Sequence, residues 1–268
     1  MLLGIDIGGT FTDIVVSDAG HVRLFKIPST PQKPAVGVIS ALSNLIEREV
    51  IIPDRVGEIR HGSTVATNAL LEGKWARTAL VTTRGFRDVL EIGRQNRPKL
   101  YDLFFERPAP IVARDQRFEV TERLDYCGKV IKPLVTDDVE RLIPLLREQS
   151  VETVAVVFLF SYLDPTHERA VQDVISSALG VPVTISSDIL PEFREFERTS
   201  TTVISAALRP VIGSYLTSLE TGAKKIGLNT RWQIMQSNGA ITSADYAQAN
   251  PARILLSGPA AGVEGARV

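Results

Sequence analysis

The opening of the chain carries two kinds of hydrophobic periodicity. Residues 2–7 and 14–16 are short apolar runs rich in β-branched side chains, which predicts two buried strands joined at a Gly-Gly pair. Residues 21–27 alternate between apolar and polar side chains, as a third strand does. Apolar residues then recur at helical spacing over 36–46. We therefore expect a hairpin, a third strand and a helix at the start of the chain.

Strands and helices alternate through the middle of the chain. A strand that ends with small polar residues over 59–63 is followed by a helix over 65–71 and by a core strand over 79–83. Between 96 and 133 the periodicity fades while arginines, prolines and aromatic residues increase, which indicates an insertion. The next segments alternate as a βαβ unit and predict a parallel sheet: a helix over 135–147, a strand over 154–160, a helix over 165–179 and a strand over 181–185.

The last third of the chain begins with a charged run, 192–198, after Leu190-Pro191. We interpret this run as the solvated start of a helix, with Phe193 and Phe196 facing inward because three-residue spacing puts them on one face. The remaining expected elements are a helix over 199–219 bent at Pro210, a strand over 231–236 ending in a turn at 237–239, a strand over 253–256 and a small-residue helix from Gly258.

The turn between the first two strands carries the residue types of a nucleotide site. Gly8 and Gly9 have no Cβ to hold an anion away from the backbone, and Thr10 and Thr12 add hydroxyl donors. Asp6, at the end of the first strand, would present a carboxylate to a hydrated magnesium ion. An ordinary Gly-Gly hairpin explains the glycines but leaves the carboxylate and the hydroxyls unused. The spacing fits neither G-x-x-x-x-G-K-[ST] nor G-x-G-x-x-G before a helix.

Two further hydroxyls, those of Ser63 and Thr64, lie between an expected strand and an expected helix. Either of them could cap the helix. A helix N-terminus is itself an anion site, so capping and ligand binding are compatible. Both interpretations stay open at this point.

The composition is that of an ordinary globular protein and limits the possible partners. The 268 residues, 44% hydrophobic and 23% charged, suffice for one large or two medium domains. A net charge of −1 and a pI near 6.3 argue against a nucleic-acid partner. One basic cluster is either a local anion site or a solvated loop; it contains Arg84, Arg87, Arg94, Arg97 and Lys99.

Cysteine and histidine usage gives no sign of a disulfide or a zinc site. The single cysteine, Cys127, fits a reducing compartment and has no histidine close in sequence to activate it. His21, His61 and His167 show no metal-ligand spacing. No window reaches the roughly 20 apolar residues of a membrane span, and no signal peptide precedes the first strand. We therefore expect a cytoplasmic protein with no membrane partner.

The string Asp6-Ile-Gly-Gly-Thr-Phe-Thr-Asp13 resembles the first phosphate loop of the superfamily of actin, sugar kinases and heat-shock chaperones, in which a β-hairpin covers the phosphates of ATP. It is most similar to one branch, the hydantoinase A and 5-oxoprolinase family. The segment His61-Gly-Ser-Thr-Val-Ala-Thr-Asn-Ala69 resembles another block of that family, with serine in place of its first threonine. Further blocks follow in the family's order at 81–88, 92–98, 197–202, 237–239 and 257–263.

This resemblance implies an α/β fold of the ribonuclease-H-like, actin-like ATPase type, with a mixed sheet and flanking helices. Residues 1–190 would be the family's N-terminal domain, and 191–268 the beginning of the hydantoinase A domain, which stops before the second phosphate loop. The chain would then be the first lobe plus the connecting helix. The second lobe would come from a continuation of this chain or from a partner polypeptide.

The implied function is the ATP-binding portion of an ATP-dependent hydrolase that opens a cyclic amide, with ATP and magnesium as cofactors and a hydantoinase B-type subunit or the second lobe as partner. The alternatives are a subunit of an ATP-dependent ketone carboxylase and a non-catalytic nucleotide-binding module. The implied site residues are Asp6 and Asp13 for catalysis, with Asp6 also on magnesium through water; Gly8, Gly9, Thr10 and Thr12 on phosphate; and His61, Ser63, Thr64 and Asn68 facing the substrate.

Overall fold

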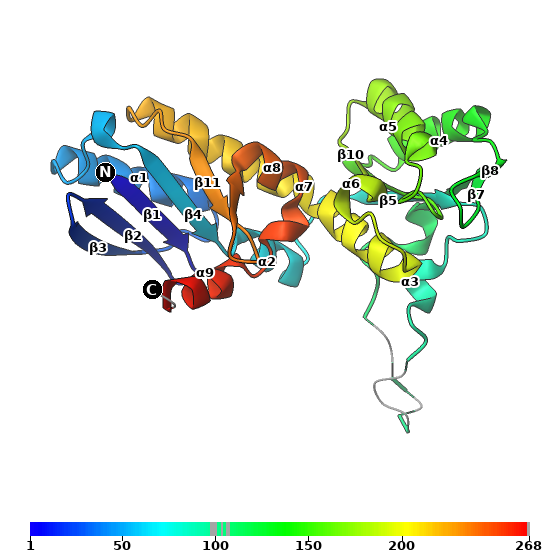
Figure 1. Cartoon of the computed structure of the whole chain (residues 1–268), viewed down its shortest axis with the longest axis horizontal. Helices are drawn as coiled ribbons and strands as arrows, with labels where there is room; N and C mark the ends of the chain where they lie inside the picture. Colours follow the sequence, from blue (N-terminus) through cyan, green and yellow to red (C-terminus); the bar gives the residue numbers. More distant parts are fainter. Residues whose placement is uncertain (97–100, 103, 106–107, 267–268) are drawn as a thin grey trace. The chain divides into compact units, whose positions relative to one another are not determined.

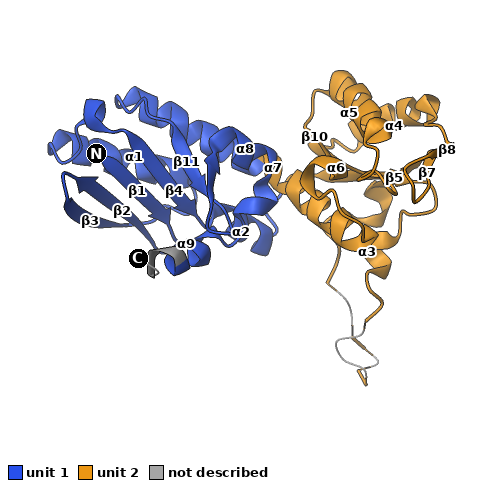
Figure 2. Ribbon diagram, in the orientation of Figure 1, with its two compact units in different colours: residues 1–75, 211–268 blue, residues 76–210 orange. Residues whose placement is uncertain are grey.

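The computed structural model of the chain describes residues 1–96, 101–102, 104–105 and 108–266 (Figure 1). It divides into two compact units (Figure 2). Unit 1 comprises Met1–Trp75 and Val211–Val268, and unit 2 comprises Ala76–Pro210. The chain therefore leaves unit 1 once, builds unit 2 and returns.

Unit 1 is built on a six-stranded mixed sheet in the order β12-β11-β4-β1-β2-β3. Strands β1, β2 and β3 form an antiparallel meander, β4 and β11 run parallel to β1, and β12 is antiparallel to β11. The strand bounds are β1 Leu2–Ile7, β2 Phe11–Asp18, β3 His21–Pro28, β4 Glu58–Ser63, β11 Trp232–Met235 and β12 Ile241–Ser243.

Helices cover the apolar face of this sheet. Alternate residues of β1, namely Leu3, Ile5 and Ile7, are buried there. A Cβ added at Gly222 would lie 2.6 Å from Ile39, so the two longest helices of the unit pack closely against each other. The helical bounds are α1 Pro34–Glu47, η1 Pro53–Arg55, α2 Val65–Leu71, α7 Glu195–Lys225, α8 Ala244–Ala249, η3 Pro251–Ile254 and α9 Ser257–Ala266. Helix α7 begins in unit 2 and ends in unit 1.

Unit 2 contains a four-stranded parallel sheet in the order β10-β9-β5-β6. Residues of β9 point alternately into two apolar clusters, so both faces of the sheet are covered and every residue of β5, β9 and β10 is buried. The bounds are β5 Thr78–Thr83, α3 Val89–Ile92, η2 Arg114–Gln116, β6 Arg117–Val120, β7 Arg123–Leu124, β8 Val130–Lys132, α4 Thr136–Glu148, β9 Thr153–Val157, α5 Thr166–Leu179, β10 Val183–Ile185 and α6 Ser186–Ile189.

The opening hairpin, the third strand and the parallel βαβ segment predicted from the sequence are confirmed. Three expectations were wrong. Residues 253–256 form no strand, because Pro251 lacks an N–H and starts a 3-10 turn that ends at Ile254. Phe193 precedes the helix and is 64% exposed. The range 96–133 is not an insertion outside the sheet, because β6, which lies in this range, pairs with β5 of the parallel sheet. The two units also divide the chain elsewhere than at residue 190, and that sequence boundary stays a prediction.

Candidate functional site

Hydrogen bonds from Ser29 fix the turn between β1 and β2. The Ser29 N–H donates to Thr10 O at 2.9 Å and its hydroxyl donates to Gly8 O at 2.8 Å, while Gly8 N donates to Phe11 O at 3.0 Å. Neither glycine of the turn has a positive φ, so the turn does not require glycine for its backbone angles. A Cβ added at Gly9 would meet nothing within 4 Å. The turn is therefore fixed in shape and open at Gly9 to an approaching anion.

The two threonines of the turn have different surroundings. Thr10 is exposed at the tip, where its hydroxyl can reach a ligand. Thr12 is only 3% exposed, and its hydroxyl lies 3.0 Å from that of Ser29. The structure thus places Thr12 beneath the turn, where it supports Ser29. A direct contact of Thr12 with phosphate stays a prediction, and Ser29 is a turn residue that the sequence did not indicate.

Asp6 and Asp13 lie directly opposite each other on β1 and β2. Asp13 is paired with Lys26 at 2.7 Å, whereas Asp6 has no hydrogen bond or ion pair within the described residues. The backbone of β4 shields its carboxylate, since a Cβ added at Gly62 would lie 2.9 Å from Asp6 Oδ1. This desolvation, together with the charge of Asp13, raises the pKa of Asp6. A cation at this position would relieve both effects.

The end of β4 is tied to the end of β1 by Thr64. Its N–H and its hydroxyl both donate to Ile7 O at 3.0 Å, so the hydroxyl does not cap α2. Thr64 is the N-cap residue, and the Oγ of Ser63, one residue earlier, accepts from Val65 N, the first N–H of the helix, at 3.1 Å. Asn68, one turn into α2, donates from Nδ2 to Thr64 Oγ1 at 3.3 Å. Thr64 and Asn68 therefore form one connected group that is hydrogen-bonded to the end of β1.

His61 lies in the core, contrary to the expectation that it faces a substrate. It is 1% exposed, because its register with Ile5 puts it on the buried face of the sheet. Its Nδ1 lies 3.1 Å from Ile5 O and its Nε2 2.6 Å from the Tyr215 hydroxyl. Since a carbonyl only accepts, Nδ1 carries the proton and Tyr215 donates to Nε2. Burial lowers the pKa of His61 to about 4 and raises that of Tyr215.

The buried neutral His61 predicts a loss of stability in mild acid. In the unfolded chain the imidazole takes up a proton near pH 6.5, but in the folded chain it does so only near pH 4. The stabilisation is complete above pH 6.5 and falls as the pH drops. Between pH 7 and pH 5 we expect His61 to account for a loss of about 2 kcal/mol. Urea unfolding at both pH values should show this difference in the free energy of unfolding. The difference should vanish in His61→Gln and persist in His21→Gln, which replaces an exposed histidine.

A pocket of about 810 Å³ adjoins the turn between β1 and β2. Its walls are the turn itself, the loop from Ser29 into α1, one side of α2, and the α7 residues Ser214, Tyr215 and Ser218. Of the predicted site residues it brings together Gly8, Gly9, Thr64 and Asn68. It does not include Asp6, Thr10, Thr12, Asp13, His61 and Ser63. The residues that the sequence did not indicate come from α7 and from the loop before α1.

Two arginines of the basic cluster form ion pairs. Arg84 lies 3.2 Å from Asp138 and Arg94 lies 2.7 Å from Glu197, which favours the solvated-loop interpretation. Arg97 and Lys99 lie outside the described residues. In the part of the chain that the structure describes, no three His, Cys, Asp or Glu side chains are grouped to hold a metal ion. Among the same residues, no helix has the length and apolar character needed to cross a bilayer.

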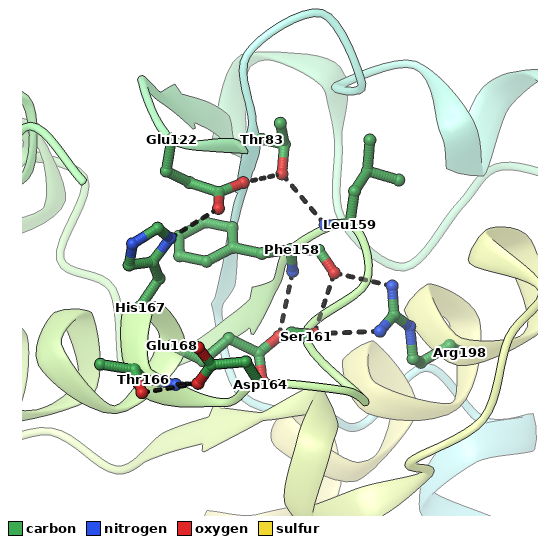
Figure 3. Close-up of polar contacts among 10 residues, drawn as sticks. All are labelled: Thr83, Glu122, Phe158, Leu159, Ser161, Asp164, Thr166, His167, Glu168 and Arg198. Atoms are coloured by element: carbon green, nitrogen blue, oxygen red, sulfur yellow. Dashed lines mark hydrogen bonds and ion pairs between the residues drawn. The ribbon is translucent and has the colours of Figure 1, made fainter. Parts of the chain in front are cut away.

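A cluster of polar side chains is buried in unit 2, where the parallel strands β5 and β9 end (Figure 3). Glu168 is fully buried and accepts hydrogen bonds from Phe158 N at 3.0 Å and from the Ser161 hydroxyl at 2.8 Å. Arg198, also buried, donates to Ser161 Oγ at 2.9 Å and to Phe158 O at 2.7 Å. Burial lowers the pKa of Arg198, and the charge of Glu168 opposes that shift. Ser161 thus bridges a buried anion and a buried cation.

A second buried carboxylate, Glu122, belongs to the same region (Figure 3). The Thr83 hydroxyl donates to one of its oxygens, and His167 Nδ1 lies 2.9 Å from the other. Leu159 N donates to Thr83 Oγ1 at 3.1 Å, which links the loop after β9 to this pair. These contacts give His167 a partner that the spacing of the histidines did not indicate.

Comparison with known sequences identifies the family. The pattern described as hydantoinase/oxoprolinase N-terminal region matches residues 2–179, and the hydantoinase/oxoprolinase pattern matches residues 198–268. An uncharacterized protein of Methanocaldococcus jannaschii is 43% identical over 97% of this chain, and caprolactamase subunit alpha of Pseudomonas jessenii is 33% identical over 96%. 5-oxoprolinase 1 of Arabidopsis thaliana is 33% identical over 97%. The chain spans 38%, 38% and 23% of the lengths of these relatives.

Two solved structures share the fold. Nucleotide-free acetone carboxylase, described in terms of ATP-dependent acetone carboxylation, matches with a TM-score of 0.87 and 27% identity over 100% of this chain and 40% of its own. The ATP-dependent caprolactamase from Pseudomonas jessenii matches with a TM-score of 0.82 and 32% identity over 94% of this chain and 38% of its own. The expected α/β fold of the actin-like ATPase type, with a mixed sheet and flanking helices, is thereby confirmed. The chain belongs to the hydantoinase/oxoprolinase family.

Proposed function

We propose that this chain is the ATP-binding portion of an ATP-dependent hydrolase that opens cyclic amides. The observation that carries the proposal is the fixed turn, open at Gly9, beside the unpartnered carboxylate of Asp6. A caprolactamase and a 5-oxoprolinase among the relatives support the cyclic amide as substrate. Because the chain spans only part of those relatives, we propose that a second lobe or a hydantoinase B-type subunit completes the site. A cytoplasmic location belongs to the same proposal.

The proposed chemistry explains why a cyclic amide needs ATP. An amide carbonyl is a poor electrophile, so its oxygen first attacks the γ-phosphorus and the bond to ADP breaks. Water then adds to the activated carbon, the C–N bond breaks with a proton going to nitrogen, and hydrolysis of the acyl phosphate gives a carboxylate and phosphate. Such phosphoryl transfer needs mainly positioning and neutralisation of charge.

We assign the roles in this reaction from the geometry of the turn. The N–H of Gly9 and the hydroxyl of Thr10 would contact phosphate oxygens, and Gly8, whose N–H is used within the turn, would let the backbone approach the anion closely. Asp6 would hold hydrated magnesium, with Asp13 as a contact to its water. One or two carboxylates with several retained waters are typical of magnesium at a nucleotide, so the single free carboxylate fits. Bound magnesium would neutralise charge on the transferring phosphoryl group.

A second candidate is a subunit of an ATP-dependent ketone carboxylase, favoured by the likeness to acetone carboxylase. A third is a nucleotide-binding module without catalysis of its own. Release of ADP should be measured with the chain alone and with its second lobe or partner, in the presence of 5-oxoproline, hydantoin or caprolactam, and of acetone with bicarbonate. Stimulation by a cyclic amide supports the hydrolase, and stimulation by the ketone with bicarbonate supports the carboxylase. Binding of ATP without stimulation supports the module.

The open side of Gly9 gives a direct test of the phosphate site. Gly9→Val puts a branched side chain where the anion would lie, and its Cβ would have no neighbouring atom within 4 Å, so the fold should persist. We expect the affinity for magnesium ATP to fall about tenfold or more, which calorimetric titration would show. Gly57→Val is a matched control, because its Cβ would lie 3.9 Å from the nearest atom, Met1 O, and Gly57 precedes β4. Equal losses in both variants would indicate a folding effect, and unchanged affinity in Gly9→Val would remove the turn from the site.

A further inference from the structure

We propose that Asn68 recognises the cis amide group of a ring, and so selects cyclic amides over open-chain ones. The inference rests on the proposed function, in which the substrate is a cyclic amide. It names the side chain that forms hydrogen bonds with the amide group of that substrate. Its basis is the connected group Ile7–Thr64–Asn68 at the edge of the pocket.

The orientation of the Asn68 carboxamide is fixed by the strand beneath it. Thr64 has one hydroxyl proton, and it goes to Ile7 O at 3.0 Å. Its oxygen can then only accept from Asn68, at 3.3 Å, so the carboxamide nitrogen faces Thr64 and the carboxamide oxygen faces away. Within the described residues, Oδ1 and the second N–H of Asn68 have no other hydrogen-bond partner. An acceptor, Oδ1, and one N–H donor thus remain on a carboxamide that cannot turn over without breaking its hydrogen bond to Thr64. We infer that the N–H given to Thr64 is the one that points away from Oδ1, which leaves the remaining N–H beside Oδ1.

A cis amide has the complementary pattern. In a five- to seven-membered ring the N–H and the C=O point to the same side, so one carboxamide can accept from the N–H and donate to the C=O together. In an open-chain secondary amide the peptide bond is trans, and these two groups point in opposite directions. Asn68 can therefore make two hydrogen bonds with a small ring amide but one with an open-chain amide.

The position of Asn68 agrees with the chemistry of the proposed reaction. Asn68 lines the same pocket of about 810 Å³ as Gly8 and Gly9. An amide paired with Asn68 has a second lone pair on its oxygen, which is the atom that attacks phosphorus. The apolar wall formed by Val36, Val65 and Val211 suits the methylene groups of the ring.

The test compares three small amides as probes on the 268-residue chain without nucleotide. Pyrrolidinone is a cis amide, N-methylpyrrolidinone is the same ring without the N–H, and N-methylacetamide is trans. Dissociation constants come from chemical-shift titrations. We expect pyrrolidinone to bind about tenfold more tightly than the other two, because each of them loses one of the paired hydrogen bonds.

The variants separate recognition from folding. Asn68→Ala should abolish the preference for pyrrolidinone, and Thr64→Val should weaken it because the carboxamide is no longer held, whereas Thr64→Ser should keep it. Asn44→Ala, on α1 and outside this pocket, is the matched control and should behave as the wild type. Equal affinity for all three probes, or a preference that survives Asn68→Ala, overturns the inference.

Titration of magnesium ATP on the same samples distinguishes the two levels of the proposal. If ATP binds to the wild type and to Asn68→Ala while the preference for pyrrolidinone is absent, the role of Asn68 is wrong and the nucleotide site stands. If the preference is present and ATP fails to bind, the proposed ATP site fails and the recognition of the ring amide stands. If neither ligand binds, both are overturned.

Discussion

Replacing Asp6 with alanine is expected to lower magnesium-dependent ATP turnover by about a hundredfold or more in the completed enzyme. The same change should leave the free chain as stable as before, or slightly more stable. Asp6 and Asp13 are like charges directly opposite on neighbouring strands, an arrangement that costs stability unless a cation lies between them. Lys26 compensates Asp13, and the pKa of Asp6 is raised first by desolvation and second by the charge of Asp13. The change at Asp6 should thus lower the activity without lowering the stability of the chain.

Two measurements on Asp6→Ala make that separation visible. Calorimetry should show that the variant loses the gain in ATP affinity that magnesium gives the wild type, and thermal unfolding without ligand should show no decrease in Tm. Asp54→Ala, an exposed aspartate of the same unit, is the control and should change neither quantity. Turnover within a factor of a few of the wild type would remove Asp6 from the site. A clear loss of Tm would make it a structural residue.

The largest effect on stability is expected for Glu168→Ala. This carboxylate accepts two hydrogen bonds at Phe158 and Ser161, and two more come from the Ser186 hydroxyl at 2.6 Å and Ser187 N at 2.9 Å. Its removal leaves these donors without their acceptor and takes away a carboxylate whose charge stabilises the charged form of the buried Arg198 guanidinium. Breaking a buried charge pair by removing one partner costs about 3–5 kcal/mol. That is a large part of the stability of an ordinary domain.

Urea unfolding of unit 2 provides the measurement. Asp173→Ala lies on the exposed side of the same helix and should cost under about 0.5 kcal/mol. The double variant Glu168→Ala with Arg198→Ala should lose less than the two single losses combined, because the second change removes the uncompensated cation. A loss below about 1 kcal/mol for Glu168→Ala would show that water or rearranged side chains satisfy the cluster.

Local patterns predicted the elements of this fold better than the surroundings of single residues. The β1–β2 hairpin was predictable because two β-branched runs flank a pair of glycines, and the parallel strands of unit 2 because both of their faces are buried. His61 was expected to face a substrate, although the alternation of residues in its strand indicates a buried side chain. Ile59, His61 and Ser63 alternate on one face of β4, so the residue between two buried positions is buried as well.

Contacts between distant segments had no comparable signal in the sequence. Ser29 supports a turn that is 21 residues away, and Tyr215 reaches His61 across 154 residues. Such partners are set by how helices pack on the sheet, which the spacing of neighbouring residues does not encode. The 3-10 turn at Pro251 is a case in which a local signal was overlooked. The short apolar run there is typical of a strand, but the proline in front of it starts a 3-10 turn instead.

The two ends of unit 2 meet, since Ala76 N donates to Ala207 O at 3.0 Å. A segment whose ends lie side by side can be removed or exchanged without pulling apart the domain that carries it. In evolutionary terms, residues 76–210 form a cassette that a single recombination event can insert, delete or swap. In engineering terms, the junction after Trp75 is the place to graft a different module onto unit 1.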